Sequence, residues 1–202
     1  MKTFKLPILL RYAVVVAIAA LMAPTEAEAQ IVSKATLKYL DGAVPVVDGI
    51  VTYTDTIAIE GRTKDEIFET MRVYFDSLVS KSDHEEYSRV TERDASNGVL
   101  AASVAEWMYF KRSSWKTDFC HFRYQLIAEC GEGVCVLKLW RINYIYDEER
   151  YAKNATYTAE EWITDENAYK KNSRELKKAP GKFRRATVDR VEEIFKEIAA
   201  LF

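Results

Sequence analysis

The side chains best suited to chemistry are spread thinly along the chain, and their spacing favours no reactive centre. His84 lies in a polar stretch and His121 lies beside Arg123 in a strand-like segment, without a serine motif or a paired cysteine. Neighbouring carboxylates such as Glu160-Glu161 point apart on a strand and lie about 100° apart on a helix, so they form no acid/base pair by themselves. The seven glycines are scattered singly, without a phosphate-binding loop. We therefore expect no catalytic residues; a small envelope hydrolase is the alternative.

The three cysteines have two interpretations. Cys130 and Cys135 flank the turn Gly131-Glu132-Gly133, and a hairpin there brings their Cβ atoms within range of a disulfide in an oxidising compartment. Alternatively, all three are small apolar fillers, a role that Cys120 fits because it lies on the apolar face of its strand. The cysteines and histidines lack the spacing of zinc ligands, so we expect no metal and no cofactor.

Two groups of residues are candidates for binding a partner. From Lys170 to Arg190, nine basic residues stand against two acidic ones, and this stretch would attract an anionic partner such as lipid head groups or an acidic glycan. The alternative is a solvated linker and helix start. Aromatic residues also crowd the strands, and two helices cover only one face of a sheet, so some aromatics face outward unless residues 151–179 cover them. From these two groups, we expect the following residues to bind a partner: Trp107, Tyr109, Arg123, Trp140, Tyr144, Lys182, Arg184 and Arg185.

The first 29 residues have the pattern of a signal peptide. A basic start, an apolar run from Tyr12 to Ala23 and the small-x-small site Ala27-Glu28-Ala29 predict cleavage after Ala29 and export to the periplasm or the exterior. The alternative, a membrane anchor, needs about 20 apolar residues, roughly twice the uninterrupted run. Cleavage removes three of 29 basic and two of 31 acidic residues, which leaves a net charge of −3. That balance argues against a nucleic-acid partner, and no later segment is apolar enough to span a membrane.

Periodicity predicts the elements of the mature chain. Alternation predicts a strand over residues 51–59, and Thr63 with Glu66 forms a capping box that starts an amphipathic helix reaching Leu78. Asn97-Gly98 predicts a two-residue hairpin turn between strands at 87–94 and 99–112. Strands at 116–129 and 134–146 follow, the last with Trp140, Ile142 and Tyr144 on one face and Leu137, Leu139 and Ile145 on the other.

The last third of the chain is expected to begin with loop at 152–158. Short helices then follow at 159–162 and 166–171, a break at Pro180-Gly181, and an amphipathic helix from Thr187 onwards. This order of elements predicts an α+β domain, an antiparallel sheet with both main helices on one face. The predicted organisation is a signal peptide at 1–29, an extended lead at 30–46 and a single domain at 47–202.

Several segments resemble one family of exported bacterial proteins. Residues 39–51 (YLDGAVPVVDGIV), 63–67 (TKDEI), 107–111 (WMYFK), 122–127 (FRYQLI), 159–165 (AEEWITD) and 181–185 (GKFRR) are similar to a domain of unknown function with a TBP-like fold. The resemblance implies a β-α-β(4)-α order and brings no catalytic residues. TATA-box binders and Bet v 1-like lipid carriers share this broad architecture, and fold alone does not assign a function.

From these patterns we expect an exported, non-enzymatic module that binds a small apolar, glycan or protein ligand. The ligand would lie on the sheet face or between sheet and helix. A scaffold subunit of an envelope complex is the third hypothesis beside the hydrolase.

Overall fold

The computed structural model describes residues 36–81, 87–112, 117–146 and 155–202. The chain divides into two units, Met1–Lys38 and Tyr39–Phe202, and the second is described below. The predicted signal peptide and its cleavage site lie outside the described residues.

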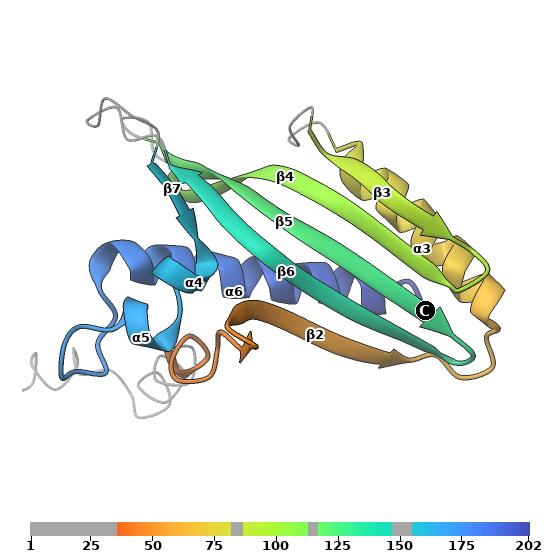
Figure 1. Ribbon diagram of the computed structural model, residues 1–202, viewed down its shortest axis with the longest axis horizontal. Helices are drawn as coiled ribbons and strands as arrows, with labels where there is room; N and C mark the ends of the chain where they lie inside the picture. Colours follow the sequence, from red (N-terminus) through yellow and green to blue (C-terminus); the bar gives the residue numbers. More distant parts are fainter. Residues whose placement is uncertain (1–35, 82–86, 113–116, 147–154) are drawn as a thin grey trace, which may run out of the picture. The chain divides into compact units, whose positions relative to one another are not determined.

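The described residues form one seven-stranded antiparallel sheet. Its order is β1-β2-β6-β5-β4-β3, and β7 pairs with the same edge of β6 beyond the end of β2 (Figure 1). The strands form because β-branched and aromatic residues alternate with polar ones along most of this segment. Their bounds are β1 Val46–Val47, β2 Ile50–Ala58, β3 Arg89–Asp94, β4 Val99–Arg112, β5 Thr117–Gly131, β6 Val134–Tyr146 and β7 Ala155–Thr158.

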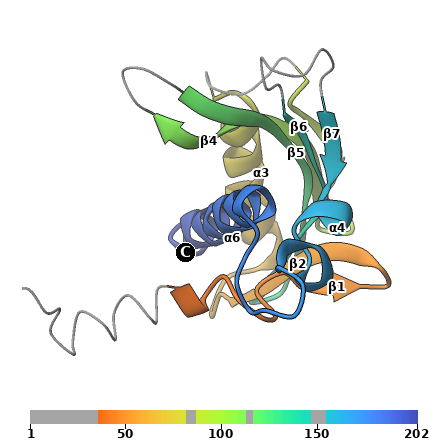
Figure 2. The ribbon, with the colours of Figure 1, turned by 90° about the vertical axis from the view of Figure 1, so that its left-hand side faces the viewer.

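Two long helices pack on one face of this sheet, as predicted (Figure 2). Helix α3 spans Lys64–Val79, and the expected capping box between Thr63 and Glu66 is present at its start. Helix α6 spans Lys178–Ala199, and the short helices α4 (Ala159–Trp162) and α5 (Asp165–Ala168) precede it. The core lies between the sheet and the two long helices. Its fully buried side chains include Phe75, Met71, Phe122, Leu126, Leu137, Phe183 and Ile194.

The break expected at Pro180-Gly181 is wrong, because α6 begins at Lys178 and runs through both residues. Pro180 lies in the first helical turn, where backbone N–H groups have no acceptor within the helix, so its missing N–H costs nothing. Gly181 is needed for space: a Cβ there would lie 2.9 Å from the Cβ of Leu176. The helix therefore extends nine residues further toward the N-terminus than Thr187, where the sequence pattern placed its start.

The turn between β3 and β4 is also longer than predicted. Asp94 pairs with Val99, so four residues rather than two connect the strands. The Asp94 carboxylate holds this turn by accepting hydrogen bonds from the Ser96 hydroxyl (2.6 Å) and the Asn97 backbone N–H (3.0 Å). Gly98 has φ 71°, and a Cβ there would lie 2.2 Å from the carbonyl oxygen of Cys130, so glycine is required.

Residues 155–158, expected as loop, form β7 instead. Their partner residues on β6 are 143–146, which continue past the end of β2 and would otherwise present unpaired backbone groups. None of the helices in the described ranges is long and apolar enough to cross a membrane.

Candidate binding surface on the open sheet face

One face of the sheet faces away from α3 and α6. Figure 1 looks onto this face, and no described helix crosses β4, β5 or β6 there. We call it the open face. Strand β5 shows the division most clearly, because Phe122, Tyr124 and Leu126 are buried under the helices while His121, Arg123 and Gln125 alternate with them and stay partly exposed. Cross-strand partners share a face, so the open face comprises Trp107 and Tyr109 of β4, Phe119, His121, Arg123, Gln125, Ile127 and Glu129 of β5, and Val136, Lys138 and Trp140 of β6.

An aromatic cluster occupies one end of the open face. Strand register places Trp107 opposite His121 and Tyr109 opposite Phe119. The Trp107 ring lies 4.0 Å from the His121 ring and 5.2 Å from the Phe119 ring, measured between centroids, and Tyr109 lies 5.8 Å from Phe119. Tyr109 is 40% exposed. The structure thus brings two of the predicted binding residues, Trp107 and Tyr109, into one partly exposed patch.

Cationic side chains lie over aromatic rings of this face. The Arg112 guanidinium is 3.7 Å from the centroid of Tyr109, and the Trp140 ring has Lys138 at 4.0 Å and Arg141 at 4.5 Å. Such cation–aromatic contacts hold long side chains in place and keep their charge accessible from solvent.

A further cation of this face, Arg123, lies 5.6 Å from the ring centroid of Tyr87, which is itself 64% exposed. Among the described strand residues directed to the open face, five are basic and three are acidic. These are Arg89, Arg112, Arg123, Lys138 and Arg141 against Glu92, Asp94 and Glu129. The face is therefore locally positive although the chain as a whole is acidic.

A β-bulge at Arg141 decides which side chains of β6 reach the open face. Arg123 pairs with Asn143 whereas Gln125 pairs with Trp140, so β6 carries an extra residue between them, and Arg141 has φ 52°. The extra residue reverses the alternation. The predicted grouping of Trp140 with Ile142 and Tyr144 is therefore wrong: Trp140 faces outward, whereas Ile142 and Tyr144 join Leu137 and Leu139 in the core.

Tyr144 consequently lies away from the open face. Its side chain is fully buried, and its hydroxyl is 2.7 Å from the Thr187 hydroxyl of α6. Burial raises the pKa of Tyr144 well above its ordinary value, so the phenol stays neutral and acts as a hydrogen-bonding group of the core.

The three basic residues selected on α6 point in different directions. Lys182 donates to both Asp118 oxygens at 3.0 and 2.8 Å and to the Tyr146 hydroxyl at 2.7 Å, and it lies 4.6 Å from the Phe110 ring centroid. Arg184 is fully buried, while Arg185 is exposed. They form no single basic patch, because residues one and two positions apart on a helix do not face each other, so Arg184 projects from a different side than Lys182 and Arg185.

Arg184 joins three parts of the fold. Its Nε donates to the carbonyl of Tyr39 at 2.6 Å, and its Nη2 donates to the carbonyl of Leu40 at 2.7 Å. Nη1 donates to the Ile163 carbonyl at 2.7 Å, and Nη2 also reaches Asp165 Oδ1 at 2.5 Å. The guanidinium thus fastens residues 39–40 and the α4–α5 connection to α6, which is a structural use of this side chain.

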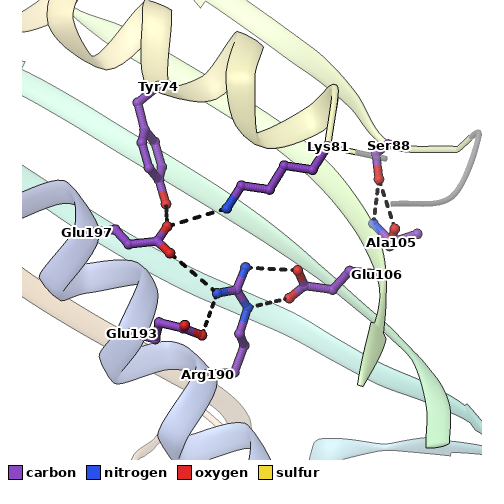
Figure 3. A network of polar contacts seen from close by, with 8 residues as sticks. All are labelled: Tyr74, Lys81, Ser88, Ala105, Glu106, Arg190, Glu193 and Glu197. Carbon is purple, nitrogen blue, oxygen red and sulfur yellow. Dashed lines mark hydrogen bonds and ion pairs between the residues drawn. The ribbon is translucent and has the colours of Figure 1, made fainter. Parts of the chain in front are cut away.

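A second ion-pair network, which the sequence analysis did not identify, lies between β4, α3 and α6 (Figure 3). Glu106 accepts two hydrogen bonds from Arg190, at 2.8 and 2.9 Å, and Arg190 also donates to Glu193 at 2.7 Å. Glu197 continues the network by accepting from the Tyr74 hydroxyl of α3 at 2.9 Å. The available signal was Glu106 itself, a carboxylate among the apolar residues from Val104 to Phe110, because a charge that is buried must meet a partner.

The described residues include no group of three or more His, Cys, Asp or Glu side chains placed to hold a metal. Both oxygens of the most buried carboxylate, Glu106, accept hydrogen bonds from Arg190, and His121 packs against Trp107. Burial raises the pKa of the Cys120 thiol far above its ordinary value, which disfavours the nucleophilic thiolate.

Comparison with known proteins gives the family. Residues 53–145 match the description "Domain of unknown function (DUF4468) with TBP-like fold". The crystal structure of a DUF4468 family protein from Bacteroides ovatus ATCC 8483 is 32% identical, with a TM-score of 0.74, and the match covers 82% of this chain and 93% of that one. This chain belongs to the DUF4468 family. The family resemblance and the α+β, TBP-like fold expected from the sequence are thus confirmed.

A second solved structure supports the same fold. A TBP-like protein from Parabacteroides distasonis ATCC 8503 is 25% identical with a TM-score of 0.65, covering 78% of this chain and 96% of that one. No curated protein matches this DUF4468 chain. The family description assigns no function, so the function is argued below from the open face.

Proposed function

We propose that this protein is an exported, non-enzymatic binding module whose open face binds an acidic glycan. The observation that carries the proposal is the pairing of cations with aromatic rings on a sheet face that no described helix crosses. Export rests on the leader pattern of the first 29 residues. The binding residues in this proposal are Trp107, Tyr109, Arg123 and Trp140, together with Arg112, Lys138 and Arg141.

An acidic glycan suits both components of the face. Aromatic rings are amphipathic surfaces on which the apolar faces of sugar rings pack, and Tyr109 and Trp107 present such surfaces near one end. Carboxylate or sulfate groups along the glycan would pair with Arg112, Lys138 and Arg141, whose side chains lie over the rings of Tyr109 and Trp140. Ordering these side chains before binding reduces the entropic cost of binding.

The proposal predicts binding that depends on charge. Polygalacturonate and its methyl ester share the same sugar ring and differ in charge, so the open face should bind the former more tightly. Each exposed ion pair contributes up to about 1 kcal/mol. Reversing two cations in Lys138→Glu/Arg141→Glu should therefore weaken binding of polygalacturonate roughly tenfold, since about 1.4 kcal/mol corresponds to a factor of ten.

The matched control is Lys178→Glu/Arg185→Glu. Both residues are exposed on α6, away from the open face, and the substitution changes net charge equally. Isothermal titration calorimetry at low salt would measure affinity, and circular dichroism would establish that both variants fold. Three outcomes would each overturn the proposal. The first is that the methyl ester binds as tightly as polygalacturonate, and the second is that both double variants lose the same affinity for polygalacturonate. The third is that single-stranded DNA binds more tightly than polygalacturonate.

A further inference from the structure

Cys130 and Cys135 lie directly opposite one another across the hairpin that joins β5 and β6. The hairpin closes at the pair Gly131 and Val134, so two residues, Glu132 and Gly133, form its turn. Gly133 has φ 69°, as tight hairpin turns of this length require. This turn fixes the register, and therefore the pairing of the two cysteines.

The hydrogen-bond pattern shows that the two cysteines form a non-hydrogen-bonded pair of the ladder. The backbone N–H of Cys130 donates to the carbonyl of Gly98, 2.8 Å away on the opposite side from β6. The Cys130 carbonyl oxygen also points that way, since it would lie 2.2 Å from a Cβ at Gly98. In such pairs the Cα atoms lie about 4.5 Å apart and the side chains approach closely, which falls within the range that disulfides span.

We propose that Cys130 and Cys135, thiols in this structure, form a disulfide in the mature protein, and that Cys120 stays a thiol. Cys120 is on the same strand as Cys130 but ten residues away, opposite Met108 of β4, so register separates it from both partners. The oxidant is a disulfide, either of an oxidoreductase or of a small molecule such as glutathione.

The reaction is an exchange of thiols and disulfides. The Cys130 thiolate attacks one sulfur of the oxidant, which breaks the oxidant's S–S bond and releases one thiol. The Cys135 thiolate then attacks the Cys130 sulfur of the mixed disulfide, forms the internal bond and releases the second thiol. Two cysteine thiols are thereby oxidised and one disulfide is reduced to two thiols.

The bridge would strengthen an end of the sheet on which other elements depend. Gly133 accepts from the N–H of Ile59 at 2.7 Å and donates to the carbonyl of Arg62 at 3.0 Å. The Glu132 carboxylate accepts from the N–H of Lys64, the first residue of α3, at 3.2 Å. The hairpin turn therefore supports the connection between β2 and α3. Because Cys130 and Cys135 are buried, the exchange takes place before the hairpin packs against the core.

The test is to refold the reduced full-length chain in a buffer of reduced and oxidised glutathione, then alkylate it in denaturant without reductant. Intact mass should show one alkylated thiol in the wild type and none in Cys120→Ser. Cleavage after Glu129 and Glu132 separates Cys130 from Cys135, so the bridged product should appear as two peptides joined by a disulfide. The double variant Cys130→Ser/Cys135→Ser should again show one alkylated thiol.

Two outcomes would overturn the proposal. One is three alkylated thiols in wild-type protein whose circular dichroism shows that it has refolded. The other is a disulfide peptide that contains Cys120. Both readouts are independent of glycan binding, so the proposal and the function proposed above fail separately.

Discussion

Replacing Arg184 with methionine should destabilise the protein severely. Methionine retains much of the apolar stem but removes every donor of the guanidinium. The carbonyls of Tyr39, Leu40 and Ile163 and the carboxylate of Asp165 then lose their hydrogen bonds to this side chain. Both the global stability and the local stability around residues 39–40 should fall, because this side chain fastens residues 39–40 to α6.

The expected magnitude follows from the burial of each partner. The bond to Ile163 is fully buried, and an unsatisfied buried carbonyl costs about 1 to 3 kcal/mol. Asp165 is 45% exposed and regains water, so its bond contributes less than a buried ion pair would. Together with the two partly buried carbonyls, we expect a loss of about 3 to 5 kcal/mol, comparable to removing one member of a buried pair.

The assay is urea unfolding followed by tryptophan fluorescence, with Arg185→Met as the matched control. Arg185 is the next residue on the same helix but is exposed, so its replacement should change stability by no more than about 0.5 kcal/mol. Hydrogen exchange at residues 40–44 should increase in Arg184→Met and remain unchanged in the control. Unfolding midpoints that agree within error would refute the structural role assigned to Arg184.

Two further predictions concern Tyr144 and Asp94. Tyr144→Phe removes a buried hydrogen bond with Thr187 and should lower the free energy of unfolding in urea by about 1 kcal/mol. In the double variant Tyr144→Phe/Thr187→Val, the loss of stability should differ from the sum of the two single losses. Strictly additive losses would contradict the contact. Hydrogen bonds from Ser96 and then Asn97 lower the pKa of Asp94 from 3.8 to about 2. The carboxylate of Asp94 stays ionised to lower pH in the folded protein than in the unfolded chain, so it stabilises the fold wherever it is ionised. Wild type should therefore exceed Asp94→Ala in stability by a constant amount above pH 3.8, and this difference should disappear toward pH 2. A difference in urea midpoint that stays constant across this range would contradict the role of Asp94.

Local signals were sufficient for much of the fold. The capping box at Thr63 and the alternation along β5 predicted a helix start and a two-faced strand, because hydrogen bonds of the first helical turn and the period of two are properties of neighbouring residues. The order of elements then predicted the α+β arrangement with both long helices on one face, which the structure and the DUF4468 relatives confirm. The same period of two puts Trp107 and Tyr109, two residues apart, on one face of β4.

Non-local contacts decided the rest. Sequence alone determined most of the strands and helices, but neither β7 nor the first nine residues of α6, and it showed that aromatic side chains exceed what two helices cover. Whether Trp140 or Tyr144 faces outward depended on a bulge at Arg141, which arises from pairing with β5 rather than from the residues of β6. Likewise Arg184 appeared as one cation among nine, and its burial became evident once carbonyls of residues 39, 40 and 163 converged on it. Charge and periodicity are visible along a chain, but the partners that satisfy a buried group come from segments up to 145 residues away, and tertiary structure alone brings them together.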